Sequence, residues 1–123
     1  MDFNLSESQL EVQRLARDFA QNKIAPVAMK FDESQEFPME LAKELGEMGF
    51  LGIIFPEEYG GSGFSILDYA IIVEEISKAD PSLGLTVASH NGLCTNHIYM
   101  FANEELKKKY MPDLTSGTKL GAW

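Results

Sequence analysis

The strongest structural signal in this sequence is the run SILDYAIIVEEISKADPSLG, residues 65–84. Ser65 and, three residues later, Asp68 form the capping-box pattern of a helix N-terminus. Apolar side chains then recur at helical spacing around more than one face, so this helix should be largely buried. Its charged residues should face water: Glu74, Glu75 and Lys78. Asp80-Pro81 should end it and start the next helix, because proline fits the first helical position.

The sequence on the N-terminal side predicts two further helices. Ser6 and Gln9 form a second capping box, followed by an apolar stripe. Pro26 interrupts that stripe and should kink the helix or split it in two. A short helix should open at Pro38 and end near Gly49, since glycine suits the left-handed position after a helix.

The remaining segments are read as connections and one last helix. Residues 51–55 are a short apolar run that we expect to be extended against the core, and the glycine-rich residues 57–63 should form a loop. No Gly-Lys-Ser/Thr follows that loop, which disfavours a phosphate-binding site. Asn103 should cap the last helix, and Pro112 should begin a final turn before Gly117.

Together these signals predict an all-α fold, an orthogonal or up-and-down bundle of about five helices joined by short loops. After Gly117 the alternation of Thr118, Leu120 and Ala122 is typical of the start of a strand. That strand would have no partner within the sequence, so the bundle looks truncated at the start of a further element.

Composition excludes several classes of protein. The net charge of −9 disfavours a nucleic-acid partner, because phosphate backbones attract basic surfaces. The basic residues 107–109 lie beside Glu104 and Glu105 and are read as a solvated helix face. One cysteine, Cys94, cannot form an internal disulfide or a Cys-rich metal site, which fits a reducing compartment. With no signal-peptide pattern and no apolar run near about 20 residues, we expect a soluble intracellular protein.

The helix expected after Pro81 differs from the others. It has no charged residue between Asp80 and Glu104, yet it carries many uncharged polar side chains: Thr86, Ser89, His90, Asn91, Thr95, Asn96 and His97. At ideal helical spacing, one face would carry Thr86, His90, Leu93 and His97. This helix could line a ligand, or it could pack tightly with its hydroxyls bonded one turn back. The residues alone favour the second interpretation.

Other chemistry is disfavoured on this helix and elsewhere. His90 and His97 would lie about 10 Å apart along the helix axis, too far for one zinc ion whose nitrogen ligands must lie about 2 Å away. Cys94 has no base in register and is expected to be a small core residue. The adjacent carboxylates at 57–58 and 74–75 should point apart into solvent. The chain therefore holds no complete catalytic apparatus.

Several stretches resemble the N-terminal helical domain of the acyl-CoA dehydrogenases. They occur in that family's order and spacing: MDFNLSESQLEVQRLARDFAQNKIAPVA, FPMELAKELGEMGFLGIIFPEEYGGSG, DYAIIVEEISKADPSLG, HNGLC and NEELKKKYMPDLTSGTKLGAW. The ordered set covers essentially the whole chain. The MDFNL start and the GTKLGA end look most like the short-chain, butyryl-CoA type of bacteria.

The resemblance implies a domain boundary and a set of site residues. Residues 1–117 would be the helical domain, and residues 118–123 would start the first strand of an FAD-binding β domain. Trp123 matches the aromatic position that opens the flavin-contacting segment. Four residues match positions that line the acyl pocket: Thr86, Ser89, His90 and Leu93. The family's Thr-Glu-Pro motif and catalytic glutamate lie beyond this sequence, so we expect the chain alone to be inactive.

The resemblance also implies an activity and its partners. The full enzyme would use FAD to oxidise a short-chain acyl-CoA to the trans-2-enoyl-CoA, and an electron-transferring flavoprotein would receive the electrons. It would be a homotetramer or homodimer in a bacterial cytoplasm. Two alternatives stay open. One is a flavin monooxygenase or oxidase on the same scaffold, and the other is a non-catalytic helical interaction module, which would lack exposed apolar surface.

Overall fold

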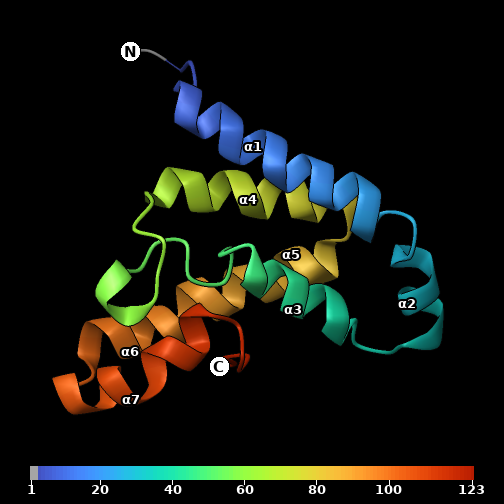
Figure 1. Ribbon diagram of the computed structural model, residues 1–123. Helices are drawn as coiled ribbons and strands as arrows, with labels where there is room; N and C mark the ends of the chain where they lie inside the picture. The colour runs from blue at the N-terminus through green and yellow to red at the C-terminus, as the bar shows by residue number, and fades with distance from the viewer. Residues whose placement is uncertain (1–2) are drawn as a thin grey trace.

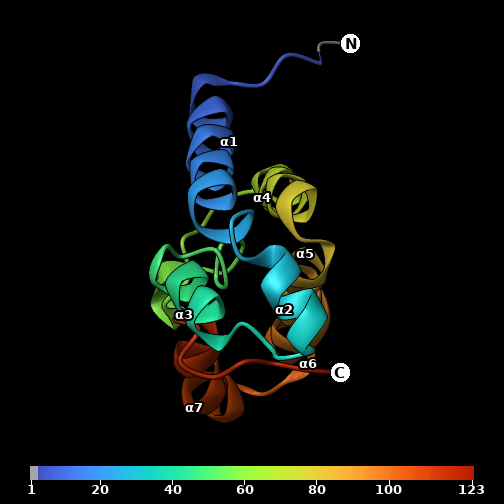
Figure 2. The ribbon, with the colours of Figure 1, turned by 90° about the vertical axis from the view of Figure 1, so that its right-hand side faces the viewer.

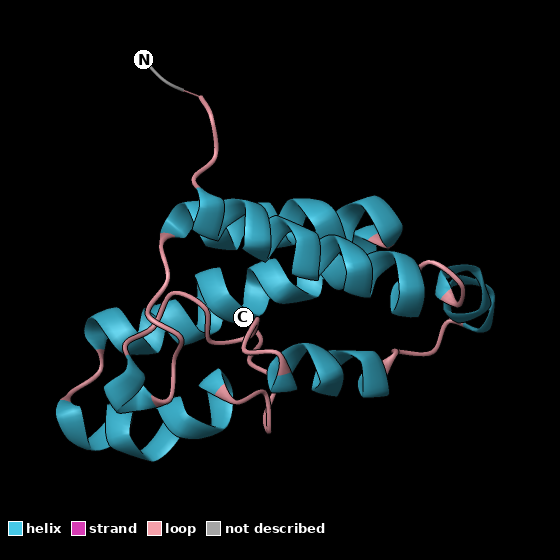
Figure 3. Ribbon diagram, turned by 45° about the horizontal axis from the view of Figure 1, so that its top comes forward, coloured by secondary structure: helices cyan, strands magenta, loops and turns pink. Residues whose placement is uncertain are grey.

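The computed structural model describes residues 3–123 and contains helices but no strand within that range (Figures 1 and 3). The α-helices are α1 (Glu7–Phe19), α2 (Ala28–Ser34), α3 (Met39–Glu47), α4 (Ile66–Ala79), α5 (Pro81–Ala88), α6 (Asn96–Phe101) and α7 (Glu104–Thr115). Two π-helical stretches, Ala20–Ile24 and Ser89–Thr95, extend α1 and join α5 to α6. A 3-10 turn spans Glu57–Tyr59. The all-α prediction is confirmed.

The predicted helix starts are present as hydrogen bonds. The Ser6 hydroxyl accepts from the Gln9 N–H, and the Gln9 side chain accepts from the Ser6 N–H. Ser65 and Asp68 make the same reciprocal pair at the start of α4. Such a cap is worth about 0.5–2 kcal/mol, since it satisfies donors that the helix itself leaves free.

Of the other local predictions, those for Pro26 and Gly49 are confirmed and the one for residues 51–55 is wrong. The helix splits at Pro26, because the first segment ends at Ile24 and α2 begins at Ala28. Gly49 adopts a φ of +80°, as expected after a helix. Residues 51–55 are not extended: they form consecutive turns, with the Phe55 N–H donating to the Gly52 carbonyl. The apolar run is buried, as predicted, but its glycine-rich surroundings favour turns over a strand.

Pro112 does not begin a turn but lies inside α7. The proline removes one N–H from the helical ladder, which is costly where the freed carbonyl is buried. The freed carbonyl is that of Lys108, an exposed residue, so water can meet it and the helix continues to Thr115. No helix in residues 3–123 combines the length and apolar character that a bilayer span requires.

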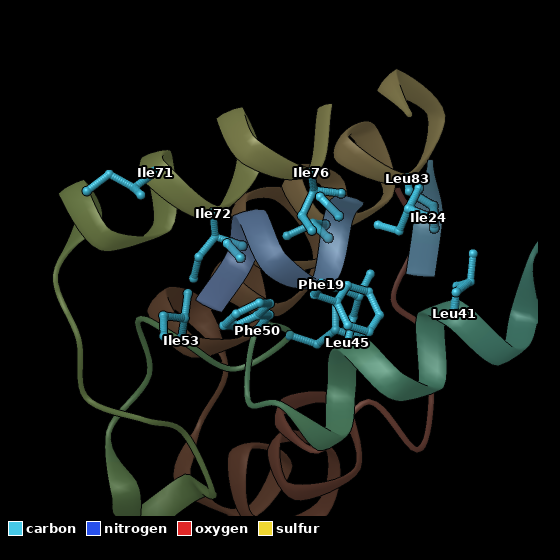
Figure 4. Packing of buried hydrophobic residues seen from close by; sticks show 14 of the residues in the cluster. Phe19, Ile24, Leu41, Leu45, Phe50, Ile53, Ile71, Ile72, Ile76 and Leu83 are labelled. Carbon is cyan, nitrogen blue, oxygen red and sulfur yellow. The ribbon is translucent and has the colours of Figure 1, made fainter. Parts of the chain in front are cut away.

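The helices stack in tiers. Figure 2 shows α1 and α4 above, α3 and α5 in the middle, and α6 and α7 below. α1 packs along α4, and α4 packs in turn on α5. The core between them includes Phe19, Leu45, Phe50, Ile72, Ile76 and Leu83 (Figure 4). Burying a side chain of this size contributes about 1.5–3 kcal/mol, so this cluster stabilises the packing of α1, α3, α4 and α5.

The prediction that the side chain of Glu75 faces water is wrong. The side chain is 3% exposed, and its carboxylate accepts from Arg17 Nη2 at 2.9 Å and from Lys78 Nζ at 3.0 Å. The hydrogen bond from Arg17 is the largest cause that lowers the pKa of Glu75, against the opposing effect of burial. Arg17 lies on α1, 58 residues away, so helical periodicity within α4 cannot reveal the partner. Its neighbour Glu74 is exposed, as predicted.

Candidate functional site

The continuous helix of residues 81–101, made of α5, Ser89–Thr95 and α6, has a buried face and an open face. Its buried face consists of Leu83, Gly84, Val87, His90, Asn91 and Thr95. Its open face carries four apolar side chains that are half or more exposed: Leu85, Leu93, Met100 and Phe101. A π-helical stretch needs more residues per turn than an α-helix, so it rotates later side chains relative to ideal spacing. The middle of this helix therefore departs from the faces that the sequence predicts.

A hollow of about 520 Å³ lies on the open face. It is lined by Phe37, Ser82, Leu85, Thr86, Ser89, Leu93, Leu120, Gly121, Ala122 and Trp123. A second hollow of about 210 Å³ adjoins it, and the two share Leu93 and Trp123. We call this combined surface the open strip. It brings together four of the five residues that the sequence singles out: Thr86, Ser89, Leu93 and Trp123.

The lining of the open strip is mostly apolar with a few hydroxyl groups. The Thr86 hydroxyl donates to the Ser82 carbonyl at 3.0 Å, the one-turn-back bond that the packing interpretation expects. Its oxygen keeps lone pairs that can accept from a ligand. Leu93 is 52% exposed, and it offers only apolar contact. Such a surface suits an alkyl chain that carries a polar group at one end.

The structure does not bring His90 to this hollow. The imidazole is fully buried, on the side of the helix that faces α7 and the C-terminal segment. Nε2 lies 2.9 Å from the Leu114 carbonyl oxygen, and the Gly121 N–H donates to Nδ1 at 2.9 Å. Burial lowers the pKa of His90, opposed by hydrogen bonds to the carbonyls of Leu114 and Leu51. The expected grouping of His90 with Thr86 and Leu93 fails, because the ring nitrogens of His90 meet backbone groups of α7 and the C-terminal segment on the buried side of the helix.

The C-terminal segment runs over the 81–101 helix. Trp123 is 80% exposed, and its ring centroid lies 4.7 Å from that of His97. His97 also contacts Phe101, at 4.9 Å between ring centroids. Residues 118–123 pair with no strand among residues 3–123, so the predicted strand start is only a single extended segment here. The Lys119 N–H anchors it to the Asp113 carbonyl at 3.0 Å.

Two glycines on the helix serve packing between helices. A Cβ on Gly84 would collide with Ser77 of α4, and one on Gly92 would lie 3.1 Å from the Tyr69 hydroxyl. That hydroxyl donates to the Ala88 carbonyl at 3.1 Å, so α4 and the 81–101 helix are locked together there. The space that the two glycines leave is therefore filled by the protein's own side chains.

Of the apolar side chains on the open strip, sequence reasoning found Leu93 but missed Leu85 and Met100. Leu85, Leu93 and Met100 follow one another at spacings of 8 and 7 residues, the repeat that marks one side of a helix. That signal was available, but apolar residues at this spacing usually face a core.

Among residues 3–123, no group of three His, Cys, Asp or Glu side chains could hold a metal ion.

Comparisons with known proteins identify the family of this chain. The family described as "Acyl-CoA dehydrogenase, N-terminal domain" matches residues 6–118. The short-chain-specific acyl-CoA dehydrogenase of Clostridium acetobutylicum is 43% identical over 123 residues, which is all of this chain and 32% of that protein.

Two solved structures extend the comparison. One, described under the electron transferring flavoprotein of Acidaminococcus fermentans, superposes with a TM-score of 0.94 at 42% identity, over 98% of this chain and 32% of that one. The other is an acyl-CoA dehydrogenase complexed with FAD from Bacillus anthracis, with a TM-score of 0.89 at 38% identity, over 96% of this chain and 20% of that one. The chain thus spans about a third or less of these relatives. It belongs to the acyl-CoA dehydrogenase family and corresponds to that family's N-terminal domain.

Proposed function

We propose that this chain is the N-terminal helical domain of an FAD-dependent dehydrogenase that oxidises a short-chain acyl-CoA to the trans-2-enoyl-CoA. Residues 1–117 form the helical domain, and residues 118–123 lead into a β domain. The observation that carries the proposal is the open strip, where Thr86, Ser89 and Trp123 meet on one hollow. The short-chain specificity of the Clostridium relative supports the substrate class.

In this proposal the chain supplies one wall of the acyl pocket. Leu85 and Leu93 contact the alkyl chain, and each methylene that leaves water contributes about 0.8 kcal/mol. Thr86 and Ser89 place hydroxyl groups at the side of the same hollow, where they orient the polar end of the ligand. His90 supports this wall from behind instead of touching the substrate. The catalytic base is supplied by a part of the enzyme outside this sequence.

FAD supplies the redox chemistry when bound, by accepting a hydride. The exposed indole of Trp123 offers a flat aromatic surface at the edge of the open strip, which suits contact with a flavin ring. The FAD complex of the Bacillus anthracis relative supports this cofactor. One aromatic side chain cannot hold a dinucleotide, so the proposal assigns the remaining contacts to the other domains.

The partners follow from the same proposal. The electrons pass to an electron-transferring flavoprotein, in line with the Acidaminococcus structure, and the enzyme works as a homotetramer or homodimer in a bacterial cytoplasm. A flavin monooxygenase or oxidase on the same scaffold is the competing proposal. A self-contained interaction module is less well supported, because such a module should not expose Leu85, Met100, Phe101 and Trp123 together.

The test begins with the open reading frame beyond position 123. A Thr-Glu-Pro motif and a later glutamate favour the dehydrogenase. The longer protein should purify with FAD, and butyryl-CoA added without oxygen should bleach the flavin absorbance. FAD-loaded protein that no straight-chain acyl-CoA bleaches, from butyryl-CoA to palmitoyl-CoA, would contradict the proposal. The 123-residue chain alone should give no turnover with butyryl-CoA.

A further inference from the structure

His90 is hydrogen-bonded to two parts of the chain, the end of α7 and the C-terminal segment. One ring nitrogen meets the Leu114 carbonyl at the end of α7, and the other meets the backbone N–H of Gly121, each at 2.9 Å. A carbonyl can only accept, so Nε2 must carry the proton. An N–H can only donate, so Nδ1 must be bare. The two contacts together require the neutral Nε2–H tautomer.

The contact at Gly121 is closely fitted. A Cβ on Gly121 would lie 2.6 Å from Cys94 Sγ and 2.8 Å from Cys94 Cβ, so only glycine lets the segment come this near the helix. The imidazole is fully buried, so water does not compete for Nδ1. Upstream, the segment is held at Lys119, whose N–H donates to the Asp113 carbonyl.

We infer that His90 is a positioning residue that fixes the chain at Gly121 and thereby places Leu120 and Trp123 on the rim of the hollow. The inference deepens the proposed function, because Trp123 is the residue assigned there to the flavin. It concerns a backbone contact in this chain, so it can be tested without any assay of dehydrogenation.

Two substitutions separate the two hydrogen bonds of His90. An asparagine amide reaches about as far as Nδ1 of an imidazole, so His90→Asn keeps an acceptor for Gly121 and loses the donor to Leu114. A glutamine amide reaches about as far as Nε2, so His90→Gln keeps the donor to Leu114 and loses the acceptor for Gly121. The two variants are equally polar and neutral, which makes each the control for the other.

Amide hydrogen exchange of the 123-residue chain, followed by NMR, reads out the contact directly. In His90→Gln the Gly121 amide should exchange at least about fivefold faster than in the unsubstituted chain, the effect of losing one ordinary hydrogen bond. In His90→Asn its rate should stay within about twofold. The Lys119 amide is the internal control, because its bond to Asp113 does not involve His90.

The single cysteine gives a second readout. Cys94 is partly exposed and lies against Gly121, so release of the segment should speed its reaction with a maleimide. The order of effect should be His90→Gln above His90→Asn. Far-ultraviolet circular dichroism must show equal helicity in both variants, so that any difference reflects the segment and not global unfolding.

Two further measurements decide the matter if the His90 variants do not fold. Nitrogen-15 NMR of the unsubstituted chain should show His90 protonated on Nε2 alone. Gly121→Ala should accelerate exchange at residue 121 and labelling of Cys94 with His90 intact, because the added Cβ must move away from Cys94. A proton on Nδ1 would overturn the inference while leaving the proposed function untouched, and so would an unchanged exchange rate at residue 121 in Gly121→Ala or, where it folds, in His90→Gln.

Discussion

The α1–α4 pair and the 81–101 helix differ in which kinds of side chain they bury. In α4 the isoleucines at 72 and 76 are fully buried, and its two buried carboxylates are both bonded: Glu75 to the cations of Arg17 and Lys78, and Asp68 through Oδ2 to Ser65. On the 81–101 helix, Leu85 and Leu93 are 67% and 52% exposed, while polar His90, Asn91 and Thr95 are fully buried. The buried side of α4 serves stability within this chain, whereas the 81–101 helix gathers its exposed apolar side chains around a hollow that something outside the chain can fill.

The buried polar side chains of the 81–101 helix are not fully hydrogen-bonded within residues 3–123. The Asn91 amide donates to the carbonyls of Phe50 and Val87, but within residues 3–123 its Oδ1 has no hydrogen-bond partner, and neither does Thr95 Oγ1. Unpaired buried acceptors are costly. The contrast between the two regions can therefore be tested by substituting single side chains and measuring the change in the free energy of unfolding. The substitutions begin with core residues and end with exposed ones.

The largest expected effect is at Ile76 in the core of the α1–α4 pair. Ile76→Ala removes a fully buried side chain and leaves a cavity, so the free energy of unfolding should fall by about 2–5 kcal/mol. Urea unfolding followed by circular dichroism measures the change. Leu85→Ala on the open strip is the matched control, and its effect should stay within about 0.5 kcal/mol. Equal losses at the two positions would contradict the contrast.

The second-largest effect on the free energy of unfolding should come from the carboxylate of Glu75 in the same region. Glu75→Gln keeps the shape but replaces the acceptor of two cationic donors, so it should cost about 1.5–3 kcal/mol. Glu74→Gln, one residue away and exposed, should change stability by no more than about 0.5 kcal/mol. A Glu75 variant as stable as the Glu74 variant would show that the ion pair adds nothing.

The sign of the pH dependence follows from the pairing of Glu75. Its pKa is lowered from 4.5 in the folded chain, chiefly by the hydrogen bond from Arg17. The folded state therefore binds fewer protons than the unfolded state near that pH, and its stabilisation is full above 4.5 and declines as the pH falls further. Glu75→Gln should lose less stability than the unsubstituted chain over that acidic range.

The two regions also differ in how far the sequence predicts them. Ser6, Ser65 and Asp80 predict helix starts, because their side chains can cap nearby backbone N–H groups, and the structure confirms each cap. Glu75 escaped prediction because its partner is remote in sequence. Such contacts depend on how helices pack, and no periodicity within one helix encodes that.

On the 81–101 helix the prediction was partly right for a different reason. Thr86, which ideal spacing predicts for this face, precedes the π-helical turns, and Ser89, which the family resemblance adds, opens them; both line the hollow. His90 and Leu93 both fall within those turns, where the larger number of residues per turn separates their directions further than ideal spacing does. Its two partners, Leu114 and Gly121, come from segments that are adjacent only in the folded chain.

A smaller effect is expected from the titration of His90. Its pKa is lowered from 6.5, chiefly by burial, so the unfolded chain takes up the proton first as the pH falls. Stability should be full above 6.5 and should decrease below it by up to about 1.4 kcal/mol per pH unit. His90→Asn should lack this slope in urea unfolding between roughly pH 6.5 and 5. The same slope in both chains would assign the titration to another group.

The smallest expected effect on folding is at Leu93, where the contrast predicts a role outside stability. Leu93 is half exposed, so Leu93→Ala should change the free energy of unfolding of this chain by no more than about 0.5 kcal/mol. In the longer FAD-loaded protein the same substitution enlarges the proposed acyl pocket. It should therefore shift kcat/KM from butyryl-CoA toward hexanoyl-CoA, by about 10-fold or more if one alkyl contact is worth about 1–3 kcal/mol.

The control for this shift is Leu10→Ala, which removes an equally exposed leucine from α1, away from the open strip. It should alter neither stability nor the ratio of the two substrates. If Leu93→Ala destabilised the chain as Ile76→Ala does, Leu93 would belong to the core and the open strip would be part of it. If stability held but the substrate ratio did not move, the strip would be a contact surface between domains, and the wall of the pocket would have to be sought elsewhere.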